Sequence, residues 1–338
     1  MLRIALLGEM EGVHEKRFLR AFSERGIDSR FISISSIEED PAILKTANQS
    51  HRFDLVIGGP LQHARAIRRA VEGISYIATS YAYDVLLLAQ QNKKTYQEIQ
   101  ALIPSTKGFL VDCEAVREEL VSMGAQPSNI LVAAWGLESR GVHTTVPEST
   151  RQTISTWRKG DSKIIICVRN FTTLHGVEQV IRSFHHALQS APTLKIILTG
   201  AGPLQSHLEQ LITDLDLQSS IELTGNLSEA ELRALFDLVD LYVSASLVDG
   251  TSISLLQALD SGLPVCLSRV GGNLEWAERT SGAFLFNTGD ILALSDLMLS
   301  CSNSAPQRFD RVVELDRHAN WQKNADMIAH FCHTKTIS

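Results

Sequence analysis

A turn of small residues within 240–262 has the chemistry of an anion site. Residues 241–245 are a short run of strand-forming side chains, and Thr251 or Ser252 can cap the helix that follows the turn. Amides in the first turn of a helix have no helical partner, and the helix dipole attracts negative charge. We therefore predict that the amides of Gly250, Thr251 and Ser252 bind a diphosphate.

Two glycines lie in the loop after the first apolar run, Gly8-Glu9-Met10-Glu11-Gly12-Val13. In a doubly wound sheet this loop faces the crevice that receives the ligand. The spacing is not G-x-G-x-x-G, so it does not predict a dinucleotide site. For Gly12 two interpretations stay open: a contact with a substrate, and turn chemistry alone.

Strands alternate with helical patterns in both halves of the chain, and these elements must position the loops above. The predicted strands are Leu2–Leu7, Phe31–Ser35, Asp54–Gly58, Ile74–Thr79, Gly108–Asp112, Ile130–Ala134, Lys163–Val168, Lys195–Thr199, Ile221–Thr224, Leu241–Ala245 and Val265–Ser268. Repeated βαβ units produce parallel sheets. We therefore predict an α/β fold with a parallel sheet in each half.

The length of 338 residues predicts two domains. Periodicity fades between Glu138 and Asp161, a polar segment with Gly and Pro that is typical of an interdomain linker. The tail from Arg308 to Cys332 is helical in pattern and either covers the second domain or packs on the first. The domains are therefore predicted as residues 1–155 and 156–317, followed by this tail.

The composition indicates a globular protein of a reducing compartment. Hydrophobic residues make up 44% and charged residues 20%, and the net charge of −7 argues against a general nucleic-acid binder. The five cysteines form no C-x-x-C pair, as expected of free thiols. No apolar run approaches the roughly 20 residues that span a bilayer. The first residues read as a β-strand and not as a signal peptide, so we expect a cytoplasmic protein.

Five stretches of the second half resemble the nucleotide-binding half of family-4 glycosyltransferases, in the order and spacing of that family. They are C-V-R-N-F-T-T-L-H-G-V-E-Q-V-I (167–181), L-T-G-A-G-P-L (198–204), L-T-G-N-L-S-E-A-E-L (223–232), the stretch 240–262, and G-G-N-L-E (271–275). The first half is similar more loosely, through T-S-Y-A-Y-D-V-L (79–86) and A-W-G-L-E (134–138). R-H-A-N-W (317–321) looks like the start of the family's crossover helix.

The resemblance implies the GT-B fold, in which two Rossmann-like domains face each other across a cleft. A C-terminal helix, at about 318–338, would cross back to the first domain. The implied activity is retaining transfer of a hexosyl or N-acetylhexosaminyl group. A UDP- or GDP-type nucleotide diphosphate sugar would bind the second domain, and the acceptor hydroxyl of a glycan, glycolipid or small natural product would bind the first.

Three donor-side residues follow from the resemblance. Arg169 matches the family's diphosphate arginine, whose planar fork suits phosphate oxygens; a surface charge is the alternative. Asp249 and Gln257 occupy the two ends of the family's E-x7-E element, where Asp249 would face sugar hydroxyls and Gln257 the ribose. Both residue types depart from the family glutamates, and Gln257 can also be a solvent-facing helix residue.

The remaining donor-side residues carry weaker signals. Gly202 lies in the matched L-T-G-A-G-P-L stretch, and Glu275 would sit where a second helix N-terminus faces the cleft. The family's companion lysine is missing, and His175 stands near its place, either as a phosphate contact or simply as the first residue of a helix. A neutral histidine there would donate one hydrogen bond, and a protonated one would add a charge.

On the acceptor side the resemblance points to two residues. Tyr81 takes the position at which the family often has a histidine near the reacting sugar. Asp84 matches the acid of the family pattern and would orient the acceptor. The alternative for Asp84, helix capping, is left open.

No His, Cys or carboxylate cluster has the spacing of metal ligands, so we expect no metal and no cofactor. Basic residues of the first half could favour an anionic lipid or a phosphorylated acceptor at a membrane's inner face, although a solvated helix face is the commoner explanation for such residues: Lys16, Arg17, Arg20, Arg65, Arg68 and Arg69. Two other functions remain, a catalytically weak sugar-nucleotide binder or partner subunit, and a sugar-nucleotide epimerase. The epimerase ranks last because the sequence offers no convincing acid–base pair of carboxylates.

Overall fold

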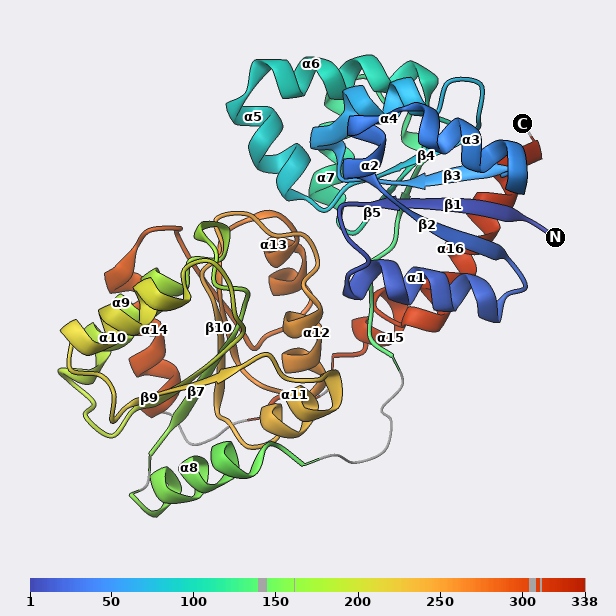
Figure 1. Cartoon of the computed structure of the whole chain (residues 1–338). Coiled ribbons are helices and arrows are strands. Elements are labelled where there is room, and N and C mark those ends of the chain that lie inside the picture. The colour runs from blue at the N-terminus through green and yellow to red at the C-terminus, as the bar shows by residue number, and fades with distance from the viewer. Residues whose placement is uncertain (139–144, 161, 304–307, 311, 338) are drawn as a thin grey trace. The chain divides into compact units, whose positions relative to one another are not determined.

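The chain folds into two compact units. A computed structural model (Figure 1) describes residues 1–138, 145–160, 162–303, 308–310 and 312–337. Unit 1 comprises Met1–Glu138 and His318–Ser338, and unit 2 comprises Ser139–Arg317. Unit 1 is therefore assembled from two separate stretches of the chain, whereas unit 2 is continuous.

Unit 1 is built on a six-stranded sheet in which every neighbouring pair is parallel, with strand order β2-β1-β3-β4-β5-β6. Its strands are β1 (Arg3–Gly8), β2 (Asp28–Ser33), β3 (Leu55–Gly58), β4 (Tyr76–Thr79), β5 (Gly108–Val111) and β6 (Ile130–Val132). In the register of the first three, Leu6 lies opposite Phe31 and Ile57. Four of the six, β1 and β3 to β5, are almost wholly buried, as expected of parallel strands covered on both faces.

Helices cover both faces of this sheet (Figure 1). They are α1 (Val13–Glu24), α2 (Ile34–Glu39), α3 (Ala42–His51), α4 (Ala64–Ala70), α5 (Ala89–Gln91), α6 (Lys93–Leu102), α7 (Glu114–Ser122) and α16 (Trp321–Ile337). One core joins the strands to α2, α3, α4, α6 and α7 through fully buried residues such as Val56, Ile67 and Ile99. Helices α1 and α16 pack against each other away from that core, and the Phe18 ring lies 5.6 Å from the Trp321 ring.

The C-terminal helix packs on unit 1 because the chain that leaves this unit and the chain that returns run side by side. The Leu137 amide donates to the Ala319 carbonyl at 2.5 Å, and the Trp321 amide donates to the Leu137 carbonyl at 2.9 Å. Farther along α16, Asp326 accepts from Arg25, the residue directly after α1, at 2.8 Å. These contacts hold the last helix to the first one.

Unit 2 has a second six-stranded parallel sheet, with strand order β12-β11-β10-β7-β8-β9. Its strands are β7 (Ile164–Val168), β8 (Lys195–Thr199), β9 (Ile221–Gly225), β10 (Leu241–Ser244), β11 (Val265–Ser268) and β12 (Ala283–Phe286). Its helices are α8 (Glu148–Lys159), α9 (Val177–Leu188), α10 (Gln205–Asp214), α11 (Glu229–Phe236), α12 (Ile253–Asp260), α13 (Gly271–Glu278) and α14 (Ile291–Asn303), with α15 (Glu314–His318) at the unit boundary.

The predicted helix starts of unit 2 are confirmed by their caps. Ser228 and Glu231 form the expected capping box of α11, in which the Ser228 amide donates to Glu231 Oε2 at 2.8 Å. Ser252 caps α12, and its hydroxyl accepts from the Leu255 amide at 3.4 Å. Each cap satisfies an amide that the helix itself leaves unpaired.

Three elements differ from the sequence prediction. The second strand ends at Ser33, and residues 34–39 turn inward as α2 with Ile34 and Ile37 buried. Strand β12, Ala-Phe-Leu-Phe, was not predicted. Part of the predicted linker, 148–159, is α8, which buries Thr150 and Ile154; residues 139–144 and 161 of that linker lie outside the described residues.

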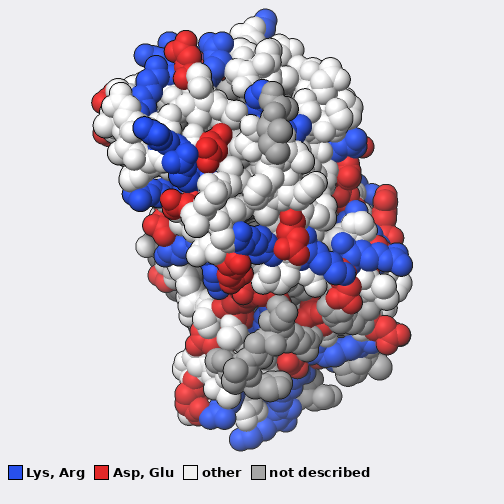
Figure 2. Space-filling model, turned by 90° about the vertical axis from the view of Figure 1, so that its right-hand side faces the viewer, with Lys and Arg blue, Asp and Glu red and all other residues white. Residues whose placement is uncertain are grey.

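Within the part of the chain that the structure describes, no helix is both long and apolar enough to cross a membrane. The five cysteines are free thiols, and four of them are buried. On the face drawn in Figure 2, Lys and Arg lie among Asp and Glu over much of the surface and gather at the upper left.

Candidate functional site

Each unit has one point at which the order of its strands reverses. In unit 2 the reversal falls between β7 and β10, and in unit 1 between β1 and β3. In open α/β sheets the ligand crevice forms at the carboxyl ends of the two strands that flank such a reversal. Arg169 directly follows β7 and Asp249 lies five residues beyond the end of β10, so both predicted residues belong to this edge of unit 2.

Arg169 and Asp249 form an ion pair at this edge. The Arg169 guanidinium donates from Nη2 to Asp249 Oδ2, and its Nε donates to the Ser244 hydroxyl at 2.9 Å. The side chains are only 7% and 14% exposed, respectively. Burial alone would lower the pKa of Arg169, but the Asp249 carboxylate raises it above its ordinary value, so the guanidinium stays charged. The surface-charge alternative for Arg169 is therefore wrong.

The turn after β10 is more engaged than the sequence predicts. The Gly250 amide donates to the Asp249 carboxylate, and the Asp249 carbonyl accepts from the Gly272 amide at 3.2 Å. Thr251 is buried, and its hydroxyl accepts from Trp276 Nε1 at 3.4 Å. Of the three amides predicted to bind a diphosphate, that of Gly250 is thus occupied by a carboxylate, because the preceding aspartate is short enough to fold back onto it.

Glycines bring the loops of this edge into backbone contact. A Cβ on Gly176 would collide with the Ala245 carbonyl, and one on Gly200 with the Arg169 carbonyl. A Cβ on Gly202 would lie 2.6 Å from the Phe171 carbonyl oxygen, and one on Gly272 would lie 2.5 Å from that of Gly250. The predicted Gly202 thus lets the loops after β7 and β8 approach each other, and Gly200 lets Arg169 take its position.

The other predicted donor-side residues lie on three nearby segments. Gln257, on α12, is 3% exposed, so the solvent-facing alternative is wrong. Glu275, in the second turn of α13, is half-buried with its carboxylate 3.9 Å from Arg279. Burial, together with the Arg169 charge, lowers the pKa of His175 to about 4. Its Nδ1 lies 2.7 Å from the Thr172 hydroxyl, so this edge has a neutral imidazole in place of a cation.

At the matching edge of unit 1, the structure joins the predicted Gly12 and Tyr81 through Glu15. The Tyr81 hydroxyl donates to Glu15 Oε1 at 2.8 Å, and the Gly12 amide donates to Oε2 at 3.2 Å. Burial raises the pKa of Tyr81 well above its ordinary value, with Glu15 adding to the shift. The rings of His14 and Trp135 lie 5.9 Å and 6.2 Å from the Tyr81 ring, respectively.

The role predicted for Asp84 in orienting an acceptor is not what the structure shows. Its carboxylate is fully buried, and its Oδ1 accepts from the Ser80 hydroxyl at 2.6 Å and from the Val85 amide at 3.0 Å. Oδ2 accepts from the Leu61 amide at 2.6 Å. Asp84 therefore joins the segments after β3 and β4, close to the capping alternative, and its oxygens have no free face for an acceptor.

Sequence reasoning missed a histidine held between two carboxylates at this edge. His63 Nδ1 lies 2.6 Å from Glu38 Oε1, and Nε2 lies 2.9 Å from Glu9 Oε1. Burial opposes protonation of His63, but the two carboxylates raise its pKa above the ordinary value. The three residues come from three segments, so no local spacing signals the cluster.

Comparison with known proteins finds a matching family and curated relatives of the chain. The family model of "Glycosyl transferases group 1" matches residues 150–325. The amylovoran biosynthesis glycosyltransferase AmsK of Erwinia amylovora is 24% identical over 225 residues, which are 64% of this chain and 51% of the relative. The chain thus spans about half the length of this curated relative, and less of several others.

Solved structures match over nearly the whole chain. HepE of Anabaena, in complex with UDP-glucose, has a TM-score of 0.76 at 15% identity, covering 99% of this chain and 100% of its own. Sucrose-phosphate synthase of Thermosynechococcus elongatus has a TM-score of 0.80 at 13% identity, covering 99% of each chain. These likenesses and the two parallel sheets confirm the predicted GT-B fold class of two Rossmann-like domains.

Proposed function

Because the chain belongs to the family of group 1 glycosyl transferases, we propose that it transfers a hexosyl or N-acetylhexosaminyl group from a nucleotide diphosphate sugar to an acceptor hydroxyl, with retention of configuration. The observation that carries this proposal is the buried, charged Arg169 at the strand reversal of unit 2, inside the matched region. A UDP- or GDP-type donor fits this position, and the UDP-glucose complex of HepE supports the UDP type.

In the proposed mechanism, Arg169 stabilises the leaving diphosphate. It now pairs with Asp249, so the incoming diphosphate would take part of that hydrogen bonding, and Asp249 would turn to the donor sugar's hydroxyls. The amides of Thr251 and Ser252 would add donors at the N-terminus of α12. Such donors act most strongly on the charge that develops as the glycosidic bond to the diphosphate breaks.

Retention follows because the acceptor attacks the anomeric carbon from the face that the diphosphate leaves. The bond between the anomeric carbon and the β-phosphate oxygen breaks, and the acceptor oxygen bonds to that carbon on the same face. The acceptor proton goes to a β-phosphate oxygen, so no protein base is required. Gln257 would bind the ribose, and Glu275 would contact the donor from α13. The acceptor would bind in unit 1 near Gly12 and Tyr81, through the oxygens of Glu15 and Tyr81.

We propose that the reaction needs neither metal nor cofactor, since a charged arginine and helix amides can balance the diphosphate. A donor panel of UDP-glucose, UDP-N-acetylglucosamine and GDP-mannose, with EDTA and then Mg²⁺ added, tests this. Transfer or slow donor hydrolysis should persist in EDTA. An activity that is lost in EDTA and restored by Mg²⁺ would contradict the proposal. Arg169→Ala should abolish turnover of the donor, whereas Arg182→Ala, at an exposed position of α9, should not.

A second candidate is a sugar-nucleotide binder with little or no turnover. It is favoured by the contact of the Gly250 amide with Asp249, which reduces the donors free to stabilise a leaving group. Tight UDP binding, with neither transfer nor hydrolysis for any donor and acceptor tried, would support this candidate. Retained transfer by the wild-type chain that is lost on Arg169→Ala would exclude it.

A further inference from the structure

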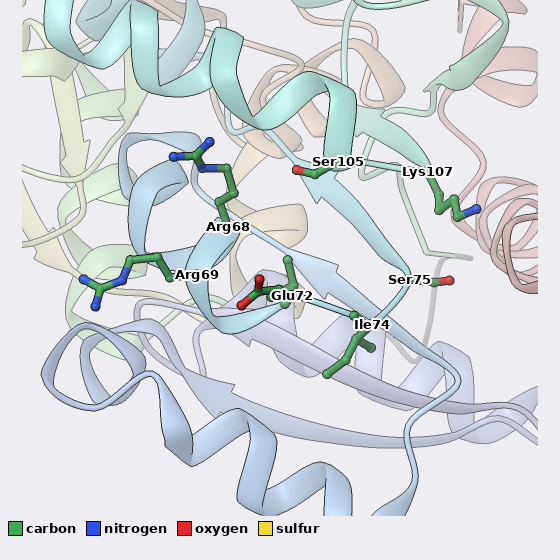
Figure 3. Close-up of a pocket in the computed structure, with 9 residues that line it drawn as sticks. Arg68, Arg69, Glu72, Ile74, Ser75, Ser105 and Lys107 are labelled. Carbon is green, nitrogen blue, oxygen red and sulfur yellow. The ribbon is translucent and has the colours of Figure 1, made fainter.

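The amino edge of the unit 1 sheet holds a pocket that the proposed reaction does not use. Its volume is about 650 Å³, within the range of small-molecule sites. It is lined by Arg68, Arg69, Val71, Glu72, Gly73, Ile74, Ser75, Ser105 and Lys107 (Figure 3). Ser75 precedes β4 and Lys107 precedes β5, whereas Gly12 and Tyr81 follow strands. Because the strands are parallel, this pocket and the proposed acceptor crevice lie at opposite edges of the sheet.

The cations of this pocket lack the partners that most arginines of the protein have. Arg68, Arg69 and Lys107 form no ion pair within the described residues, and α4 adds a third such arginine, Arg65. The pocket's acid, Glu72, instead lies 3.7 Å from the Lys45 amine. The pocket is therefore a locally positive place on a chain whose net charge is −7.

The lining chemistry suits a phosphate group attached to a small polar body. Arg68 and Lys107 extend on either side of Ser105 in Figure 3, and Ser75 adds a second hydroxyl. Arg69 extends away from the other lining residues. Both arginines are exposed, and exposed side chains change rotamer within nanoseconds, so their guanidiniums can swing over a bound anion. A guanidinium fork and an ammonium are the usual partners of phosphate oxygens.

We propose that this pocket is an anion site for a phosphomonoester or phosphodiester, separate from the donor and acceptor sites. The same chemistry occurs in a small dissolved phosphate ester and in an anionic lipid headgroup. Either ligand would be bound by Arg68, Arg69 and Lys107, with the two serine hydroxyls completing its shell. The proposal does not depend on the transferase activity, because none of these residues is assigned to it.

Two probes separate the sources: glycerol 3-phosphate measured by calorimetry, and phosphatidylglycerol–phosphatidylcholine vesicles measured by co-sedimentation. The test variant is the double substitution Arg68→Gln and Arg69→Gln. Its matched control is Lys93→Gln with Lys94→Gln, which removes the same charge from exposed positions of α6 in the same unit. A thermal melt checks that both doubles stay folded, as expected for exposed side chains.

We expect at least one probe to bind the wild type and the control double with equal affinity. It should bind the pocket double at least about tenfold more weakly, as loss of a charge-assisted contact predicts. Lys107→Gln alone should weaken binding in the same direction. Binding of glycerol 3-phosphate identifies a dissolved ester, and binding of anionic vesicles alone identifies a lipid headgroup. Absence of binding to both probes, or equal losses in the pocket and control doubles, would overturn the proposal.

Discussion

At the scale of single residues, the buried Arg169–Asp249 pair should matter for stability as well as for activity. Asp249→Ala leaves the Arg169 charge without its partner in a site where the side chain is 7% exposed. Breaking a buried pair in this way costs about 3 kcal/mol or more. Urea unfolding should show that loss for Asp249→Ala and no measurable change for Arg151→Ala, whose ion pair is exposed. Equal midpoints for the two variants would contradict the prediction.

His175 should make unfolding depend on pH. Burial, and then the Arg169 charge, lower its pKa to about 4 from the ordinary 6.5. Between these values the unfolded chain binds a proton that the folded chain refuses, so the free energy of unfolding should fall as pH drops from about 6.5 to about 4. Above pH 6.5 His175 is neutral in both states, so the folded chain has lost none of this stability. NMR titration of His175 measures the pKa directly, and His175→Gln should flatten this part of the stability profile.

From residue types and spacing, the sequence identified which residues form the donor edge but not which of them contact each other. Arg169 and Asp249 were both identified, but 80 residues separate them, and only the neighbouring positions of β7 and β10 reveal that they pair. The same holds for Glu9, Glu38 and His63, which come from three segments. Asp84 matched a pattern acid, yet its burial and three hydrogen bonds, invisible in the sequence, give it a structural role.

At the scale of elements, the loops of the unit 2 edge depend on glycines that allow backbone contact. Gly200 has a φ of 139°, and a Cβ there would collide with the Arg169 carbonyl. Gly200→Ala should therefore displace the loop after β7, lower the melting temperature and weaken UDP binding. Gly160→Ala is the control, since its nearest neighbour would be 3.5 Å from the new Cβ. Unchanged UDP affinity in Gly200→Ala would contradict this account of how Arg169 is positioned.

Strands and caps were predicted well because buried parallel strands are continuous apolar runs and capping residues act locally. The element that was hidden, α8, is polar on most of its surface and buries only Thr150 and Ile154 along its length. Its residues therefore read as a linker. A helix with so few apolar residues is too polar overall to be told from a linker by its composition, and the structure is what defines it.

At the scale of the whole molecule, the C-terminal helix should stabilise unit 1 and leave nucleotide binding unaffected. Trp321 is 2% exposed and packs against Phe18, with the Arg17 guanidinium 4.8 Å from its ring. Trp321→Ala should cost about 3 kcal/mol or more of unfolding free energy through the cavity it leaves. UDP affinity should remain that of the wild type, since the proposed donor residues all belong to unit 2.

Trp157→Ala provides the comparison for that experiment. Trp157 is half-buried on α8 of unit 2, so its truncation should cost less stability than that of Trp321. Loss of UDP affinity in Trp321→Ala at a temperature where the protein remains folded would show that the helix does more than complete unit 1.

The discontinuity of unit 1 also sets an order of events during translation. Unit 2 is a continuous stretch and can finish folding while the ribosome is still adding residues, whereas the first 138 residues await a partner helix made almost 200 positions later. Until α16 emerges, Phe18 lacks the Trp321 indole that packs against it. The nascent chain should therefore acquire nucleotide affinity before its N-terminal unit resists a protease, and a folding helper would be needed most at that unit.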